Sequence, residues 1–288
     1  MTMEYEKTRA WTSPDVRHAY TAKDTILYAL GLGIGADPLD PVQLRFTYER
    51  NLVAMPTMAA VLASPGFWMR DRPELGIDYT KLVHGEQRVT LHRPLAPEGT
   101  LIGRSRVVGI ADKGAGKGAL MHVEKTLSDE ASGALVATSE QVLFLRGDGG
   151  FANVGGGDAP APALPATPER APDVELDLPT RPDAALLYRL SGDVNPLHVD
   201  PAFAARAGFA RPILHGLATY GIAGWGLVRA FCDGDPARLT SIAARLSAPV
   251  YPGETLRLEA WREGGEVAFR CRVVERDVVV LSHGRARC

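Results

Sequence analysis

Apolar and polar positions alternate along three neighbouring segments in the last part of the chain. They read TLRLEAWREG over residues 255–264, EVAFRCRVVE over 266–275 and DVVVLSHGRARC over 277–288. A period of two residues is typical of a strand with one buried face, and the intervening Gly264-Gly265 and Arg276-Asp277 pairs are turn signals. The pattern therefore predicts an antiparallel meander of three strands.

The same alternation occurs earlier, over residues 100–110, 119–129 and 134–147. Each meander is preceded by an apolar segment rich in small residues, at 56–64 and at 216–232. The second segment is long enough for about four helical turns, although each glycine in a helix costs ~1 kcal/mol. Its glycines fit a helix that a sheet wraps closely, and both segments are predicted to be such central helices.

The two halves of the chain also match each other. LHRPLAPEGTL begins at Leu91 and LSAPVYPGETL at Leu246, and five positions are identical at an offset of 155. LYALGLGIGADP lies over LYRLSGDVNPLH at an offset of 160, and MPTM at 55–58 lies over LHGL at 214–217 at an offset of 159. Because the order along the chain is the same, a duplicated domain explains the match.

Residues 147–173 lie between the halves and are dominated by Gly, Ala and Pro. This composition is typical of an extended and poorly packed linker. We therefore expect an N-terminal domain over 1–146 and a C-terminal domain over 174–288. A central helix wrapped by an antiparallel sheet, present twice, is an α+β architecture.

Composition narrows the function classes. The 288 residues carry a net charge of −2, which gives no field that would recruit nucleic acid or an anionic membrane. No segment reaches the ~18 apolar residues that span a bilayer, and the N-terminal residues lack the apolar core of a signal peptide. The three cysteines form no C-x-x-C pair, so a reducing compartment is expected. We expect a cytoplasmic protein without nucleic-acid or membrane partners.

Candidate chemistry gathers in SGDVNPLHVDP, residues 191–201, which contains Asp193, Asn195 and His198. These residue types also make turns for backbone reasons alone. As functional groups, His198 can act as a base, Asp193 can take or return a proton, and Asn195 can hold a water. The His215-Gly216 pair follows at a predicted helix start, where an unobstructed backbone N–H suits an oxyanion.

The internal repeat serves as a control for that interpretation. In the first half, the positions of Asp193, Asn195 and His198 are occupied by Gly33, Gly35 and Pro38, and Pro56 replaces His215. A twin that kept the frame but lost all four polar side chains favours a functional role for those side chains. An acid/base pair beside an oxyanion donor is equipment for chemistry next to a carbonyl.

The stretch YRLSGDVNPLHVDPAFAARAGFARPILHG resembles the hydratase 2 motif of the MaoC-like dehydratases, the (R)-specific enoyl-CoA hydratases. LYALGLGIGADP, RFTYE, HGEQ and SAPVYPGETL extend the resemblance to the two-domain form, which includes the hydratase part of peroxisomal multifunctional enzyme type 2. The resemblance implies a double hot-dog fold, two antiparallel sheets each wrapped around a long helix. It also implies reversible hydration of a trans-2-enoyl-CoA to a (3R)-3-hydroxyacyl-CoA.

The resemblance further assigns roles to individual residues. Asp193 and His198 form the catalytic dyad that activates a water, Asn195 orients that water, and the Gly216 N–H meets the thioester oxygen. The first half is expected to line the acyl-chain tunnel, where Gly33 and Gly35 leave room for substrate. Because CoA is part of the substrate, no cofactor is expected. The resemblance also implies a homodimer.

Two further residues are candidate substrate contacts, His215 beside the oxyanion donor and Arg211, which could reach a CoA phosphate. His84 and Glu86 in HGEQ have metal-ligand character, but no other ligand is near in the sequence. No metal site is therefore expected, and both residues should hydrogen-bond near the domain interface.

Three alternatives stay open at this point: a dehydratase that acts on carrier-protein thioesters, a thioesterase on the same fold, and a non-catalytic acyl-binding protein. The sequence also leaves the acyl chain length, the physiological direction and the oligomeric state unsettled.

Overall fold

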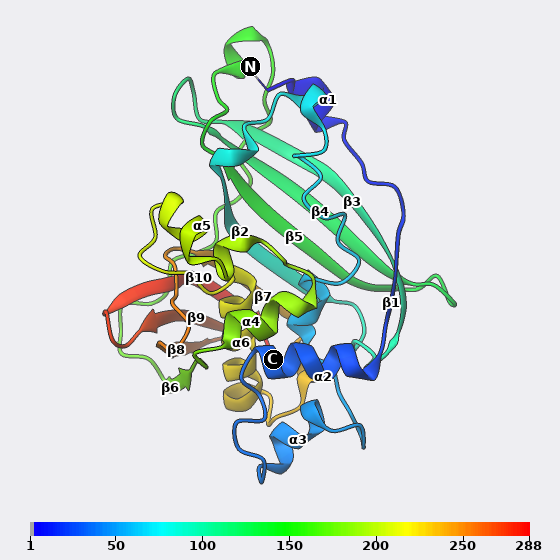
Figure 1. The fold of residues 1–288 in the computed structure, drawn as a ribbon, viewed down its shortest axis with the longest axis vertical. Helices are drawn as coiled ribbons and strands as arrows, with labels where there is room; N and C mark the ends of the chain where they lie inside the picture. The colour runs from blue at the N-terminus through cyan, green and yellow to red at the C-terminus, as the bar shows by residue number, and fades with distance from the viewer. Residues whose placement is uncertain (1–2) are drawn as a thin grey trace.

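The computed structural model describes residues 3–288, apart from the side chain of Val154, and its main element is one antiparallel sheet of ten strands (Figure 1). The strand order is β1-β3-β4-β5-β2-β7-β10-β9-β8-β6. The strands are β1 (Val16–Tyr20), β2 (Leu82–Leu91), β3 (Gly99–Asp112), β4 (Ala119–Asp129), β5 (Leu135–Leu145), β6 (Val174–Pro179), β7 (Ser241–Leu246), β8 (Thr255–Glu263), β9 (Glu266–Val273) and β10 (Val278–Arg287).

Both predicted meanders are confirmed, as β3-β4-β5 in the first half and β8-β9-β10 in the second. The two halves are continuous because β2 pairs with β7, with Val89 opposite Ile242. This seam joins two five-stranded sheets into one, and the whole is the expected α+β double hot-dog fold.

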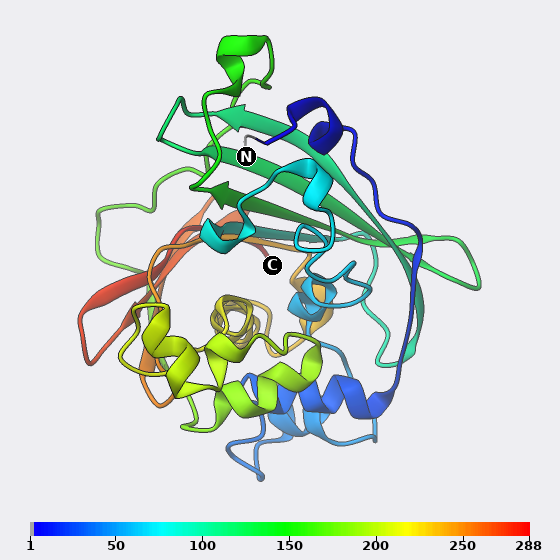
Figure 2. The same ribbon diagram turned by 45° about the horizontal axis from the view of Figure 1, so that its top comes forward.

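The main helix of the molecule is α6 (Gly216–Phe231), whose residues are almost all buried. Figure 2 shows α6 nearly end-on, with the sheet arching over one side and α2 (Ala22–Gly31) and α4 (Ala184–Tyr188) on the other. A Cβ at Gly226 would lie 2.8 Å from side-chain carbons of Leu178 and Leu258. The glycines of α6 therefore allow close wrapping, as predicted.

The remaining α-helices are α1 (Tyr5–Arg9), α3 (Pro41–Thr47) and α5 (Pro201–Arg206). The one-turn 3-10 helices are η1 (Pro56–Ala60), η2 (Pro73–Leu75), η3 (Tyr79–Lys81), η4 (Phe151–Val154), η5 (Arg189–Ser191), η6 (Pro196–His198) and η7 (Pro236–Arg238). Within residues 3–288, none of the helices has the length and apolarity needed to cross a membrane.

The long central helix predicted for the first half at 56–64 is wrong. Only the single turn of η1 forms, and the chain reverses at Ala63, whose φ of 46° is left-handed. The Ala63 carbonyl oxygen would lie 2.4 Å from a Cβ at position 103, so only Gly103 on β3 permits this turn. The sheet is therefore shaped for a short segment, which apolar periodicity does not reveal.

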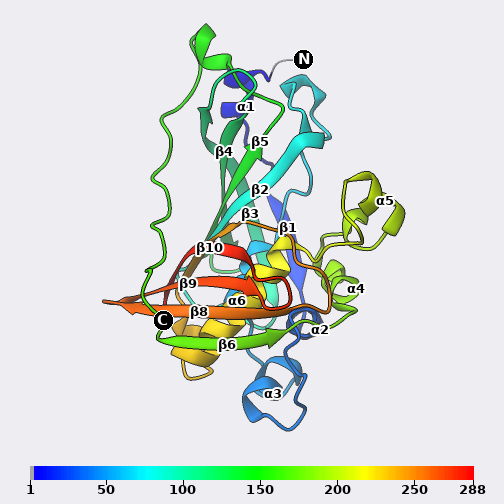
Figure 3. The same ribbon diagram turned by 90° about the vertical axis from the view of Figure 1, so that its left-hand side faces the viewer.

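The segment 147–173 is better packed at its start than the sequence suggests. Phe151 is buried and stacks on Tyr5 with ring centroids 5.4 Å apart. Asp158 accepts hydrogen bonds from Arg9 Nε at 3.0 Å and from the Ile110 N–H at 2.8 Å. Beyond Asp158 the chain runs extended along one side of the molecule to β6 (Figure 3). The domain boundaries themselves stay a prediction.

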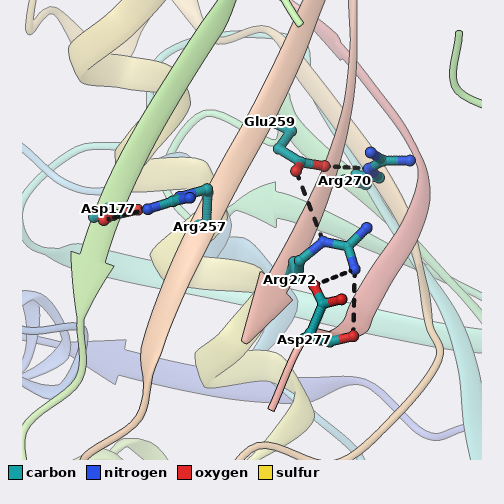
Figure 4. Close-up of polar contacts among 6 residues, drawn as sticks. All are labelled: Asp177, Arg257, Glu259, Arg270, Arg272 and Asp277. Carbon is teal, nitrogen blue, oxygen red and sulfur yellow. Dashed lines mark hydrogen bonds and ion pairs between the residues drawn. The ribbon is translucent and has the colours of Figure 1, made fainter. Parts of the chain in front are cut away.

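Charged residues line the outer face of the second half of the sheet (Figure 4). Asp177 and Arg257 form a bidentate pair with distances of 2.7 and 2.9 Å. Glu259 pairs with both Arg270 and Arg272. The Asp177 and Arg257 side chains are more than a third exposed, so their pair adds little to stability.

The seam between the halves contains a different ion pair. Glu86 on β2 is buried, and its carboxylate accepts from Arg245 on β7 at 2.9 Å and from Arg88 at 3.0 Å. Burial raises the pKa of Glu86, but the hydrogen bonds from the two guanidinium groups outweigh it and lower the net value. Glu86 is therefore charged in the folded protein at neutral pH.

We predict that Arg245→Met lowers the free energy of unfolding by about 2 kcal/mol, because it leaves a buried carboxylate with one partner fewer. Arg257→Met, which breaks the exposed pair, should cost less than ~1 kcal/mol. Urea unfolding at neutral pH measures both. The difference between Arg245→Met and the parent should close as the pH falls from 4.5 through the depressed folded-state pKa of Glu86. Equal losses for both variants would contradict the assigned role of the seam.

Candidate active site

The motif residues lie on a loop between α4 and α5. Gly192 has a φ of 117°, which a residue with a side chain rarely adopts. Asp193 Oδ1 accepts from the Asn195 N–H at 3.1 Å, and Asn195 Oδ1 accepts from the Leu197 N–H at 3.0 Å. Asn195 thus caps η6, so the structure gives it a turn-forming role. The water-orienting role stays a prediction, since the amide nitrogen and the second lone pair of Oδ1 are not used in the turn.

Asp193 and His198 face each other across a gap. His198 Nε2 lies 4.0 Å from Asp193 Oδ2. His198 Nδ1 lies 2.9 Å from the Ile213 carbonyl oxygen, which can only accept, so Nδ1 carries the proton in the neutral ring. Nε2 and Oδ2 are then both acceptors. A water placed between them could donate one hydrogen bond to each.

Exposure also differs across this pair. The Asp193 side chain is 48 % exposed, whereas that of His198 is 9 % exposed. Burial lowers the pKa of His198, while the bond to the Ile213 carbonyl and the charge of Asp193 partly offset the effect. His198 is therefore a neutral base at neutral pH. Asp193 lies on the solvent-exposed side of the pair.

His215 lies behind this pair. Its ring stacks on His198 with centroids 3.7 Å apart, and its Nε2 donates to the Asp193 backbone carbonyl at 3.1 Å. Burial, with His198 next to it, lowers the pKa of His215 to about 4. His215 is only 1 % exposed, and its Nδ1 has no hydrogen-bond partner among the described residues, so the expected direct contact with substrate stays a prediction. The residue holds the loop and the His198 ring.

Gly216 begins α6, and its N–H has no hydrogen-bond acceptor among the described residues. A Cβ at this position would lie 2.7 Å from Leu246 Cδ2. A larger residue would have to displace the Leu246 side chain. The free N–H lies at the positive end of a 16-residue helix. This is the arrangement that an oxyanion donor requires.

The other predicted substrate contacts lie farther out. Arg211 is exposed, and its guanidinium lies 5.0 Å from the centre of the Tyr251 ring. Gly33 and Gly35 have φ values of 84° and 94° in the turn after α2, so the backbone by itself explains why they are glycine. Whether they also line an acyl tunnel stays a prediction.

The sequence did not predict a row of three packed rings beside the site, formed by His215, Tyr188 and Tyr28. The Tyr188 ring lies 5.0 Å from His215 and 5.7 Å from Tyr28. The Tyr28 hydroxyl donates to Thr57 Oγ1 of η1 at 3.0 Å. The repeat contained the signal, because Tyr28 and Tyr188 are aligned in the matching Leu-Tyr-x-Leu segments.

His84 on β2 is a second residue that the sequence did not assign to the site. Its Nε2 donates to the Glu86 carbonyl at 3.0 Å. Burial lowers the pKa of His84 to about 4, and the nearby Asp193 charge partly offsets this. Because Glu86 turns to Arg245 instead, His84 and Glu86 do not converge on a metal. They hydrogen-bond near the interface between the halves, as expected.

Asp193, His198 and His215 offer ligand atoms that all lie within 4.8 Å of one another. This spacing is compatible with a bound cation, and it is equally compatible with an acid/base site. One nitrogen of each ring already donates to a backbone carbonyl, which leaves one nitrogen per ring. The expectation of no metal stays a prediction.

The fold and the site define the class of protein: a double hot-dog protein with one dyad-bearing half. Residues 163–283 match the family described as MaoC like domain, and residues 18–147 match the MFE-2 hydratase 2 N-terminal domain. The chain belongs to the MaoC-like family, in its two-domain hydratase 2 form, and the expected family resemblance is confirmed.

Relatives match over nearly the full length. The chain is 45 % identical to 3-hydroxyacyl-thioester dehydratase Y of Mycobacterium tuberculosis, over 90 % of this chain and 88 % of that protein. It is 39 % identical to peroxisomal enoyl-CoA hydratase 2 of Arabidopsis thaliana, over 93 % and 90 %. The solved MaoC-like dehydratase of Phytophthora capsici superposes with a TM-score of 0.84 at 35 % identity, covering 97 % of this chain and 96 % of that one.

We predict that His198 and His215 both titrate below 6.5, His215 at about 4. In Asp193→Asn the His198 pKa should fall further, because the charge that raises it is gone. NMR titration of the imidazole Cε1–H signals measures these values. The unfolded chain takes up protons first, so stability should fall as the pH drops below 6.5. A His198 pKa above 6.5 would contradict the geometry.

Proposed function

We propose that the chain catalyses the reversible hydration of trans-2-enoyl-CoA to (3R)-3-hydroxyacyl-CoA at the loop of Asp193 and His198. One observation carries the proposal. Asp193 Oδ2 and His198 Nε2, both acceptors, lie 4.0 Å apart. His198 stacks on His215, which directly precedes the free N–H of Gly216 at the start of a buried helix. Such a site suits one water and one thioester oxygen.

The broader statement, that the chain is a lyase of the hydratase and dehydratase type, rests on its family and on the names of its relatives. Curated relatives at 37–45 % identity are named enoyl-CoA hydratase or 3-hydroxyacyl-thioester dehydratase. The identity of the catalytic pair and the direction of the reaction belong to our proposal.

In the proposed reaction, His198 Nε2 and Asp193 hold the water between them. The water gives one proton to this pair while its oxygen bonds to C3 of the enoyl group. Charge that develops on the thioester oxygen meets the Gly216 N–H and the positive end of α6. The proton then passes to C2 on the same face, and dehydration is the reverse. The scheme uses no cofactor.

We also propose that the first half binds the acyl chain rather than a second reacting group. Pro56, at the twin position of His215, lines a mostly apolar cavity of about 100 Å³ together with Leu91 and Leu95 of the first half and with residues 235–237 and Leu239 of the second. No imidazole or carboxylate of the duplicated motif remains there. Apolar walls of this kind suit hydrocarbon, not proton transfer.

Four further points belong to the proposal. A carrier-protein thioester is the alternative substrate, since "thioester" in the name of the 45 % identical relative fits either carrier. A thioesterase is the less favoured alternative because the curated relatives at 37–45 % identity are named hydratase or dehydratase. The cytoplasmic location and the homodimer are carried over from the sequence.

We expect Asp193→Asn and His198→Gln each to lower the hydration rate by roughly 10²–10⁴-fold, as loss of an acid/base group does. Matched controls are Asp200→Asn, which keeps the N-cap of α5, and His92→Gln on the exposed end of the first half. Both controls should retain near-normal rates.

The assay follows loss of conjugated thioester absorbance with short and medium trans-2-enoyl-CoA, together with release of free CoA. Absorbance loss without free CoA, and a (3R) product, is the expected result. Free CoA would instead indicate a thioesterase. Activity only with carrier-bound substrate would select the dehydratase alternative.

A further inference from the structure

Lys125 on β4 is a buried cation that the proposed chemistry does not use. It is 7 % exposed, and its Nζ donates to the backbone carbonyls of Ala60 at 2.9 Å and Leu62 at 2.5 Å. Among the described residues it has no carboxylate partner within 4.0 Å. Burial lowers the pKa of Lys125 to about 7, and either the amine or the ammonium form can donate to both carbonyls.

The duplicated half shows what this position does otherwise. In the sheet, Ser105 pairs with Lys125, and its twin Ala260 pairs with Phe269. Lys125 therefore stands where the second half has a fully buried phenylalanine. A lysine at the twin position of a core phenylalanine has to be explained by what it binds.

The partners of Lys125 lie at the point where the first-half helix stops. A continuing α-helix would bond the carbonyls of residues 60 and 62 to the N–H groups four residues further on. Here Lys125 supplies those donors, and the chain reverses at Ala63 over Gly103. The twin of Gly103 is Leu258, which packs against α6 at Gly226. A glycine and a lysine thus replace the leucine and phenylalanine that accompany a full helix.

The segment that Lys125 ends also contacts the site. Thr57 of η1 accepts from Tyr28, the last ring of the row that leads back to His215. Thr57 Cγ2 would lie 2.7 Å from a Cβ at Gly224 of α6. A shift or lengthening of η1 would therefore change the space between the halves, beside the helix that carries Gly216.

We propose that Lys125 is a positioning residue that fixes the short form of residues 56–64 and so determines how long an acyl group the enzyme accepts. The inference rests on the proposed function, in which the first half receives the acyl chain. In the proposed binding mode, a short acyl group ends before this segment, whereas a long one reaches it. Lys125 itself touches no reacting atom.

The experiment compares Lys125→Met, which keeps length but removes the donors, with Lys125→Arg, which keeps them. Lys117→Met, an exposed lysine in the same half, is the matched control. We expect kcat/KM for a ten-carbon enoyl-CoA to fall about tenfold in Lys125→Met, the equivalent of one strong hydrogen bond. The value for a four-carbon substrate should change less than about twofold, and Lys125→Arg should recover part of the loss.

Hydrogen exchange of the amides in 57–64 supplies a readout that does not depend on activity, and it should be faster in Lys125→Met. If that variant does not fold, Gly103→Ala tests the same turn from the other side, because its Cβ would meet the Ala63 carbonyl. Equal losses for both chain lengths, or no loss, would overturn the inference. If the parent hydrates no enoyl thioester, the proposed function fails. Unchanged hydrogen exchange in 57–64 of Lys125→Met would separately refute the positioning role of Lys125.

Discussion

The pairing of β2 with β7 is the constraint on which the rest of the structure depends. It turns two five-stranded sheets into one and brings Glu86 of the first half onto Arg245 of the second. The charge of Asp193 also acts on His84 of β2, so the first half reaches the neighbourhood of the site although the motif lies in the second.

Duplication followed by divergence explains why the two halves are so unequal. The second half kept a 16-residue helix, with Gly216 at its start and the His198 ring fixed by the Ile213 carbonyl. In the first half the corresponding helix is reduced to η1. Losing the dyad and losing the helix accompany each other, which fits a division of labour between chemistry and acyl binding.

Much of this could be read from the sequence. The strands were predictable because two-residue alternation directly reflects which side chains are buried, and the repeat predicted the second meander from the first. The facing pair of Asp193 and His198 could be predicted because the two residues are close in sequence. Gly216 could be predicted as an oxyanion donor because a glycine at a helix start has an unobstructed backbone N–H.

The rest depended on contacts between distant residues. The helix at 56–64 was wrongly predicted because its end is set by Lys125 and Gly103, on strands far along the chain. The stacking of His215 on His198 could not be predicted, because it depends on how the loop folds back onto the start of α6. His84 was missed because only strand pairing across the seam brings it near Asp193.

The central claim is that a water held by Asp193 and His198 adds to C3 of an enoyl thioester. The most direct test is to run the reaction in water enriched in oxygen-18 and locate the label by mass spectrometry. We predict that the label enters the 3-hydroxyl group of the parent's product and that the thioester stays intact. Label in a free carboxylate, or a parent rate no faster than Asp193→Asn, would contradict the account.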